Sequence, residues 1–151
     1  MSVLKFILWF ELAHIAAYIV AGVIALSISK DIYKDKNRLC TFMRDMKDPK
    51  ENKRIGMLFI PAQIIRALLM SLVLLPIVDY LITFSFLKQF LFFSSLVFIF
   101  THIAAVSPFL DNIEGLVYFK KEYIKKEAFL KFQLEMVIYS VIFGIILSIG
   151  V

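Results

Sequence analysis

The sequence is poor in charge and in cysteine. Only 19% of its 151 residues are Asp, Glu, Lys or Arg, whereas 61% are hydrophobic. Soluble domains carry about 25% charged and about 45–50% apolar residues, so this composition excludes an ordinary soluble domain. The single cysteine, Cys40, excludes an internal disulfide and a cysteine-based metal cluster. A chain of this length has room for one compact domain, and we expect residues 1–151 to form a single transmembrane domain.

Several sequence motifs of soluble enzymes are also missing. The chain has no glycine-rich phosphate loop, no nucleophile elbow and no Ser/His/Asp constellation, so catalytic residues stay unassigned. The net charge of +5 does not indicate a nucleic-acid partner. The basic residues lie in two short segments that border hydrophobic stretches, and the positive-inside rule explains that distribution.

Four hydrophobic stretches predict membrane-spanning helices at residues 6–29, 55–78, 89–107 and 128–150. At about 1.5 Å per residue, such helices cross a hydrocarbon core of about 30 Å. Residues 30–54 contain nine Lys or Arg and residues 111–131 contain five, against one each in the N-terminal tail and the second connection. The segments 30–54 and 108–127 are therefore predicted to be cytoplasmic loops, with residues 31–44 extending the first helix and Asp48-Pro49 as a break.

This pattern predicts an all-α, up-down four-helix bundle with both termini on the outer side. The expected location is a prokaryotic cytoplasmic (inner) membrane. The lipid bilayer is the expected partner, and a homo-oligomer or a larger membrane complex is the expected assembly.

Polar residues inside the hydrophobic stretches are the candidate functional residues, because burying them in hydrocarbon is costly. Glu11 and His14 share one face of the first helix, Arg66 lies in the second, His102 in the third and Glu135 in the fourth. His14 and His102 lie roughly 16 and 20 Å from the outer side at 1.5 Å per residue. Two histidines at similar depth on different helices are the arrangement that ligates heme b, with the iron as the bound metal. Arg66 would neutralise a propionate.

Other interpretations of these residues stay open. Intramembrane histidines also form hydrogen bonds between helices. Arg66 and Glu135 are about one helical turn apart in depth and are expected to form a structural ion pair. Glu11 and His14 match the E-x-x-H spacing of carboxylate-bridged di-iron sites, but such a site needs two of these motifs and the chain supplies one.

The order of four features along the chain resembles the small four-helix, heme-containing membrane protoporphyrinogen oxidase family and its copper-resistance-like relatives. These features are His14 with Ala21-Gly22, Lys53-Arg54 before Pro61-Ala62, Lys88 with His102, and Glu135 after Phe132. The resemblance implies heme b binding. It also implies oxidation of a porphyrinogen coupled to electron acceptors in the membrane.

From these observations we expect a membrane protein that binds heme b through His14 and His102. Glu11 would orient His14 or relay protons, with Glu135 and Lys88 as supporting polar residues. The main alternative is a non-catalytic accessory or assembly subunit, in which the polar residues hold helices together. A small channel or transporter, in which they line a water path, is the second alternative.

Overall fold

The computed structural model describes residues 1–34 and 36–151, and every regular element in that part of the chain is a helix. Four helical stretches are long and apolar enough to cross a membrane, namely Val3–Ile28, Pro49–Leu81, Phe86–Ile103 and Lys126–Gly150. These findings confirm the prediction of an all-α fold with four potential membrane spans.

The first two spans begin earlier than predicted because short polar residues cap them. Helix α1 (Val3–Ile28) begins after Ser2, whose hydroxyl accepts a hydrogen bond from the Lys5 N–H at 3.3 Å. Helix α3 (Pro49–Leu74) begins six residues before position 55. The Asp48 carboxylate accepts hydrogen bonds from the N–H groups of Lys50 and Glu51 at 2.8 and 3.0 Å. Asp48-Pro49 therefore starts a helix, where we had predicted a break.

The predicted extension of the first helix over residues 31–44 is wrong beyond its first turn. Helix α2 (Lys30–Tyr33) is one turn long, and residues 36–48 form turns and bends. Position 35 lies outside the described residues. An isolated turn gains little from its own hydrogen bonds, so α2 depends on the buried Ile32 side chain for its position.

The second and third spans depart from regular α-helix toward their C-terminal ends. The second contains a tighter 3₁₀ turn, and the third ends in a wider π-helix. A 3₁₀ turn, η1 (Leu75–Ile77), contains Pro76 and joins α3 to α4 (Val78–Leu81). Helix α5 (Phe86–Ser95) passes into η2 (Leu96–Ile103), a π-helix that ends four residues before the predicted position 107. The segment predicted as the loop 108–127 contains α6 (Ile113–Tyr118), capped by the Asn112 side chain, which accepts from the Gly115 N–H at 2.7 Å.

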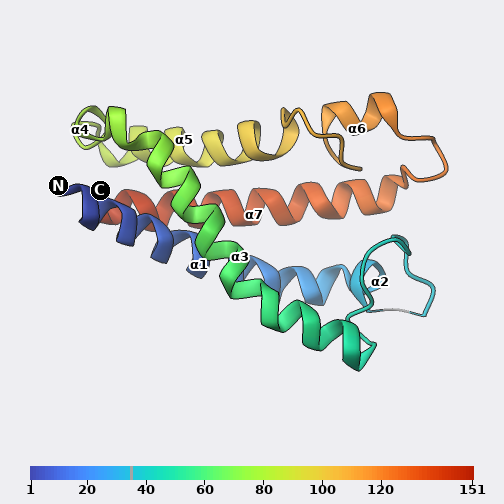
Figure 1. Cartoon of the computed structure of the whole chain (residues 1–151). Helices are drawn as coiled ribbons and strands as arrows, with labels where there is room; N and C mark the ends of the chain where they lie inside the picture. The colour runs from blue at the N-terminus through green and yellow to red at the C-terminus, as the bar shows by residue number, and fades with distance from the viewer. Residues whose placement is uncertain (35) are drawn as a thin grey trace.

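Helix α7 (Lys126–Gly150) lies at the centre of the bundle (Figure 1). It packs against both α1 and α5, while α3 crosses the outside of α1. The two termini lie together at one end, and the connections that contain α2 and α6 lie at the other (Figure 1). Gly144 brings α7 close to α5, because a Cβ at this position would lie 2.0 Å from Ser94 Oγ.

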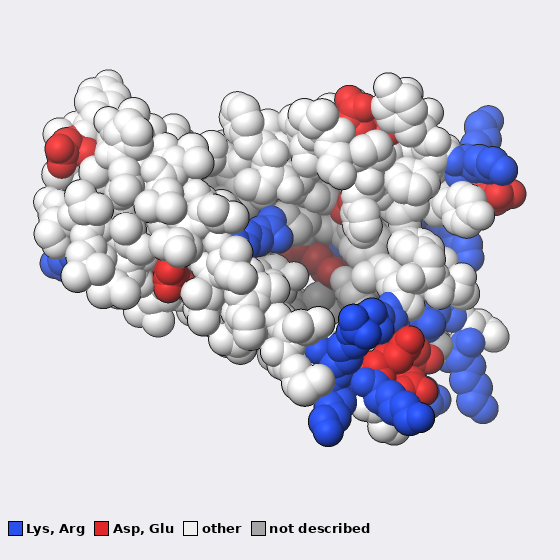
Figure 2. All heavy atoms as spheres, in the orientation of Figure 1, with Lys and Arg blue, Asp and Glu red and all other residues white. Residues whose placement is uncertain are grey.

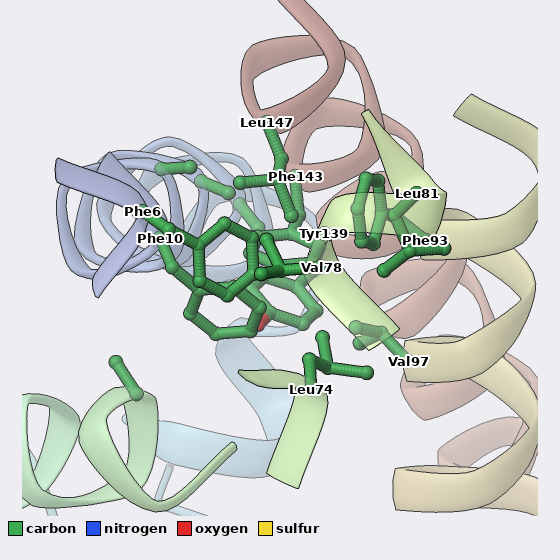
Figure 3. Packing of buried hydrophobic residues seen from close by; sticks show 14 residues of the cluster. Phe6, Phe10, Leu74, Val78, Leu81, Phe93, Val97, Tyr139, Phe143 and Leu147 are labelled. Atoms are coloured by element: carbon green, nitrogen blue, oxygen red, sulfur yellow. The ribbon is translucent and has the colours of Figure 1, made fainter. Parts of the chain in front are cut away.

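The core between these helices is largely aromatic. Phe6, Phe10, Phe93 and Phe143 are at most 1% exposed and lie where α1, α5 and α7 meet (Figure 3). Alanines at positions 13, 17 and 21 line the buried face of α1 and allow the neighbouring helices to approach closely. A second, smaller apolar cluster lies at the loop end and contains Ile32, Cys40, Leu110, Ala128 and Phe132.

Candidate functional site

His14 is completely buried in α1, and both of its ring nitrogens have partners on other helices. Nδ1 lies 2.5 Å from the hydroxyl of Tyr139 on α7, and Nε2 lies 3.0 Å from Oε1 of Gln63 on α3. A neutral imidazole satisfies this arrangement, since Nε2–H donates to Gln63 and Nδ1 accepts from Tyr139. His14 therefore joins three of the four spans at one point.

The helices α1 and α3 run antiparallel in a register that these contacts define. His14 faces Gln63, and Tyr18, four residues later on α1, contacts the ring of Phe59, four residues earlier on α3, at 5.4 Å between ring centroids. Three residues in the other direction, the same register places Glu11 at the level of Arg66. Both are half-buried, and within the described chain neither has a hydrogen bond or an ion pair.

A cavity of about 460 Å³ opens between α1, α3 and α7, next to Tyr139. Figure 2 shows this face hollowed, with atoms of an acidic residue (red) visible inside. The cavity walls are mainly apolar, and their polar groups are phenols, one carboxylate and one guanidinium. The lining residues are Tyr18, Ala21, Gly22, Ala25, Leu26, Tyr33, Met43, Arg44, Met46, Ile55, Phe59, Glu135, Met136 and Tyr139.

Glu135 is bonded to Tyr33 in the wall of this cavity. The Tyr33 hydroxyl donates to Glu135 Oε2 at 2.8 Å, and burial together with the negative charge of Glu135 raises the pKa of Tyr33. Glu135 Oε1 is buried and has no hydrogen-bond partner among the described residues. The predicted ion pair with Arg66 is not formed in this part of the chain.

His102 lies elsewhere, at the end of η2. Its Nε2 is 3.5 Å from Oδ2 of Asp111, which is 3% exposed, and its ring packs against Phe98. Burial raises the pKa of the Asp111 carboxyl, while the charge of His102 partly opposes that shift. The π-helical turns carry His102 to the edge of the span, where it meets the connection to α6. Such turns are frequent at functional sites.

Among the described residues, both ring nitrogens of His14 have hydrogen-bond partners, and His102 lies beside Asp111 and Phe98. Heme ligation by the two histidines stays a prediction. Within residues 1–34 and 36–151, no group of three or more His, Cys, Asp or Glu side chains is arranged to hold a metal ion. Lys88 is exposed at the start of α5, away from this cavity.

Comparisons with protein-family models, with curated proteins and with solved structures found no match. The resemblance to the protoporphyrinogen oxidase family therefore stays a prediction. What the site can bind has to be inferred from its own residues.

Sequence reasoning missed four residues that complete this region: Gln63, Tyr139, Tyr33 and Asp111. The first two carried a signal. Gln63 is polar inside a hydrophobic stretch and lies three residues before Arg66, and Tyr139 lies one turn after Glu135. Tyr33 and Asp111 lie in segments predicted as solvated loops, where a polar or aromatic residue gives no sign of burial.

Proposed function

We propose that this chain is an integral membrane protein that binds a lipophilic ligand in the cavity between α1, α3 and α7. The cavity itself carries the proposal. Its volume of about 460 Å³ is that of a small-molecule site, and its walls combine apolar side chains with a few polar groups. Tyr139 connects the wall to His14, so that a bound ligand would contact the polar cluster that joins three helices.

The charge distribution supports the predicted topology. Lys and Arg gather over the end of the molecule that carries α2 and α6, opposite the termini (Figures 1 and 2). Under the positive-inside rule that end faces the cytoplasm, the termini lie on the outer side, and the expected membrane is the prokaryotic inner membrane. The cavity would then open at the cytoplasmic end, since Tyr33, Met43, Arg44 and Met46 line it.

Filling the cavity tests the proposal directly. A Cβ at Gly22 or at Gly56 would have no heavy atom within 4 Å, so both positions accept a larger side chain, but only Gly22 lines the cavity. Leucine is also a better helix former than glycine. We expect Gly22→Leu to weaken binding of the fluorescent probe N-phenyl-1-naphthylamine to protein in nanodiscs at least fivefold, and Gly56→Leu to leave it unchanged. Equal probe binding by both variants would show that the cavity is not the ligand-binding site.

Heme b, with oxidation of a porphyrinogen, is the specific ligand and reaction that the sequence suggests, and both stay predictions. The visible spectrum of protein purified from membranes, oxidised and dithionite-reduced, tests the heme. A Soret band and a sharp reduced α-band that disappear in His14→Ala or His102→Ala would support it. A featureless spectrum after expression with added heme would exclude heme and leave other lipophilic ligands for the cavity.

One observation favours the second candidate function, an accessory or assembly subunit. Glu11 and Arg66 lie inside two spans, and the described part of the chain gives neither a partner. A partner protein with complementary charges would relieve the cost of leaving them unpaired in the membrane. Exchanging the charges between these two positions distinguishes a partner protein from an ion pair within the chain.

A further inference from the structure

Aromatic rings surround the cavity on several sides. Tyr18 on α1, Tyr33 on α2, Phe59 on α3 and Tyr139 on α7 all line it, so each of the four elements contributes one ring. Tyr18 lies at the centre of this set, with ring centroids 5.4 Å from Phe59 and 5.8 Å from Tyr139 in edge-on arrangements. Aromatic faces carry negative potential, and several of them around one space form a cage that attracts organic cations.

The carboxylate in this wall has a free acceptor. Glu135 Oε2 is bonded to Tyr33, but Oε1 is buried without a partner. The hydroxyl of Ser29, which is completely buried, lies close enough to this carboxyl to act on it, but their geometry is not that of a full hydrogen bond. A buried, unsatisfied carboxylate oxygen is costly unless a donor or a positive charge compensates it.

The flexible part of the wall suits a bulky ligand of variable shape. Three methionines, Met43, Met46 and Met136, line the cavity together with Leu26 and Ile55. Methionine side chains are unbranched and polarizable, so they adapt to ligands of different outline. Among the described residues that line the cavity, Arg44 is the one with a positive charge, and its side chain is exposed at the rim.

We propose that this cavity selects lipophilic organic cations, with Glu135 as the charge that distinguishes them from neutral ligands. The inference rests on the proposed function, because it names the ligand class for the same cavity. The apolar body of the ligand would lie against the methionines and rings, and its positive charge would lie near Glu135. Across a cavity with mainly apolar walls, the attraction is stronger than it would be in water.

Tetraphenylphosphonium and triphenylphosphine oxide test this choice, since the first is a lipophilic cation and the second is neutral and of related shape. We expect the wild-type protein, measured by equilibrium dialysis in detergent, to bind the cation at least tenfold more tightly. Glu135→Gln should abolish that preference and keep binding of the neutral probe. The matched control is Glu127→Gln, an exposed carboxylate two turns earlier on the same helix, which should keep the preference.

Arg44→Gln provides a second variant in case Glu135→Gln does not fold. Removing the positive charge at the rim should tighten binding of the cation about threefold and leave the neutral probe unaffected. Equal affinities of the wild-type protein for the two probes, or a preference that survives Glu135→Gln, would overturn the inference while the cavity still binds lipophilic ligands. Failure to bind either probe would overturn the proposed function as well.

Discussion

The hydrogen bond between His14 and Tyr139 connects α1 and α7 beside the cavity, with His14 completely buried and Tyr139 3% exposed. Tyr139→Phe removes the hydroxyl and leaves Nδ1 of a buried imidazole without its partner. An unsatisfied buried polar group costs about 1–3 kcal/mol, so we expect the free energy of unfolding to fall by that amount. Unfolding by SDS in mixed micelles measures it.

Tyr80→Phe is the matched control for this change. Tyr80 is 67% exposed and makes an edge contact with Phe84 that a phenylalanine preserves. We expect its effect to stay within about 0.5 kcal/mol. Equal losses in the two variants would show that the hydroxyl on Tyr139 contributes nothing specific.

Asp111 makes the stability of the folded protein depend on pH, and a single substitution can remove this contribution. Burial raises its folded-state pKa above the ordinary value of 3.8, so the folded chain holds a proton that the unfolded chain has released. The stability that results is present below the unfolded pKa and is lost as the pH rises through the folded one. Each unit of difference between the two pKa values corresponds to about 1.4 kcal/mol.

Asp111→Asn removes this titration. The melting temperature of the wild-type protein relative to the variant should therefore fall as the pH rises from below 3.8, the ordinary pKa of the carboxyl, through its raised folded-state pKa. His102 and Glu135 are the charged groups that act on Asp111 or respond to it, and both remain in the variant. Asp79→Asn, at an exposed carboxyl, is the control. A difference that does not change with pH would contradict the burial of Asp111 in the folded chain.

Single residues show where sequence reasoning stops. Depth along a helix is simple arithmetic, so His14 and Arg66 could be placed inside the membrane from the sequence. Counting residues along the sequence does not give the rotation of a helix about its axis or the angle at which two helices cross. Glu135 was therefore assigned to Arg66, whereas it bonds to Tyr33, a residue from a segment that composition alone marks as solvated.

At the scale of whole elements, the register between α1 and α3 places Glu11 level with Arg66 in neighbouring spans. We expect the two side chains to pair across the helix interface when they are in a bilayer. Glu11→Gln and Arg66→Gln should each cost about 2–3 kcal/mol, because each leaves one charge unpaired inside the membrane. The double variant Glu11→Arg with Arg66→Glu restores opposite charges and should recover most of that loss.

SDS unfolding of the four proteins measures this coupling, and Glu127→Gln on the exposed part of α7 serves as the control with an expected effect below about 0.5 kcal/mol. If the exchanged pair is as unstable as the single variants, the charges serve a partner protein. That result would favour the accessory-subunit function.

Element boundaries were predictable where hydrophobicity alone sets them and not where caps do. The four spans were found because each is a long apolar stretch. The start of α3 was missed because Asp48-Pro49 is equally suited to a turn and to a helix N-terminus, and the outcome depends on whether the next N–H groups reach the carboxylate. Asn112 likewise caps the N-terminus of α6 by accepting a hydrogen bond from a backbone N–H group.

At the scale of the whole molecule, the position of α7 decides where a cavity can form. Short connections predicted an up-down order but not which helix would be central. Gly144 allows α5 to pack tightly on α7, and the Trp9 indole donates to the carbonyls of Ile146 and Leu147, each at 3.2 Å, which fixes α1 to the same end of α7. These contacts close the terminal end of the bundle, and the cavity lies toward the connections.

Orientation in the membrane determines from which side this cavity opens. In a Cys40→Ser background, Lys88→Cys lies at the exposed start of α5 and Lys121→Cys in the connection before α7. We expect a membrane-impermeant maleimide to label Lys88→Cys in intact cells and Lys121→Cys only after the cells are opened, because the proposed topology keeps the basic connections in the cytoplasm. The opposite labelling pattern would show that the protein has the inverse orientation, with the cavity open to the outer side. A ligand would then reach Glu135 from outside the cell.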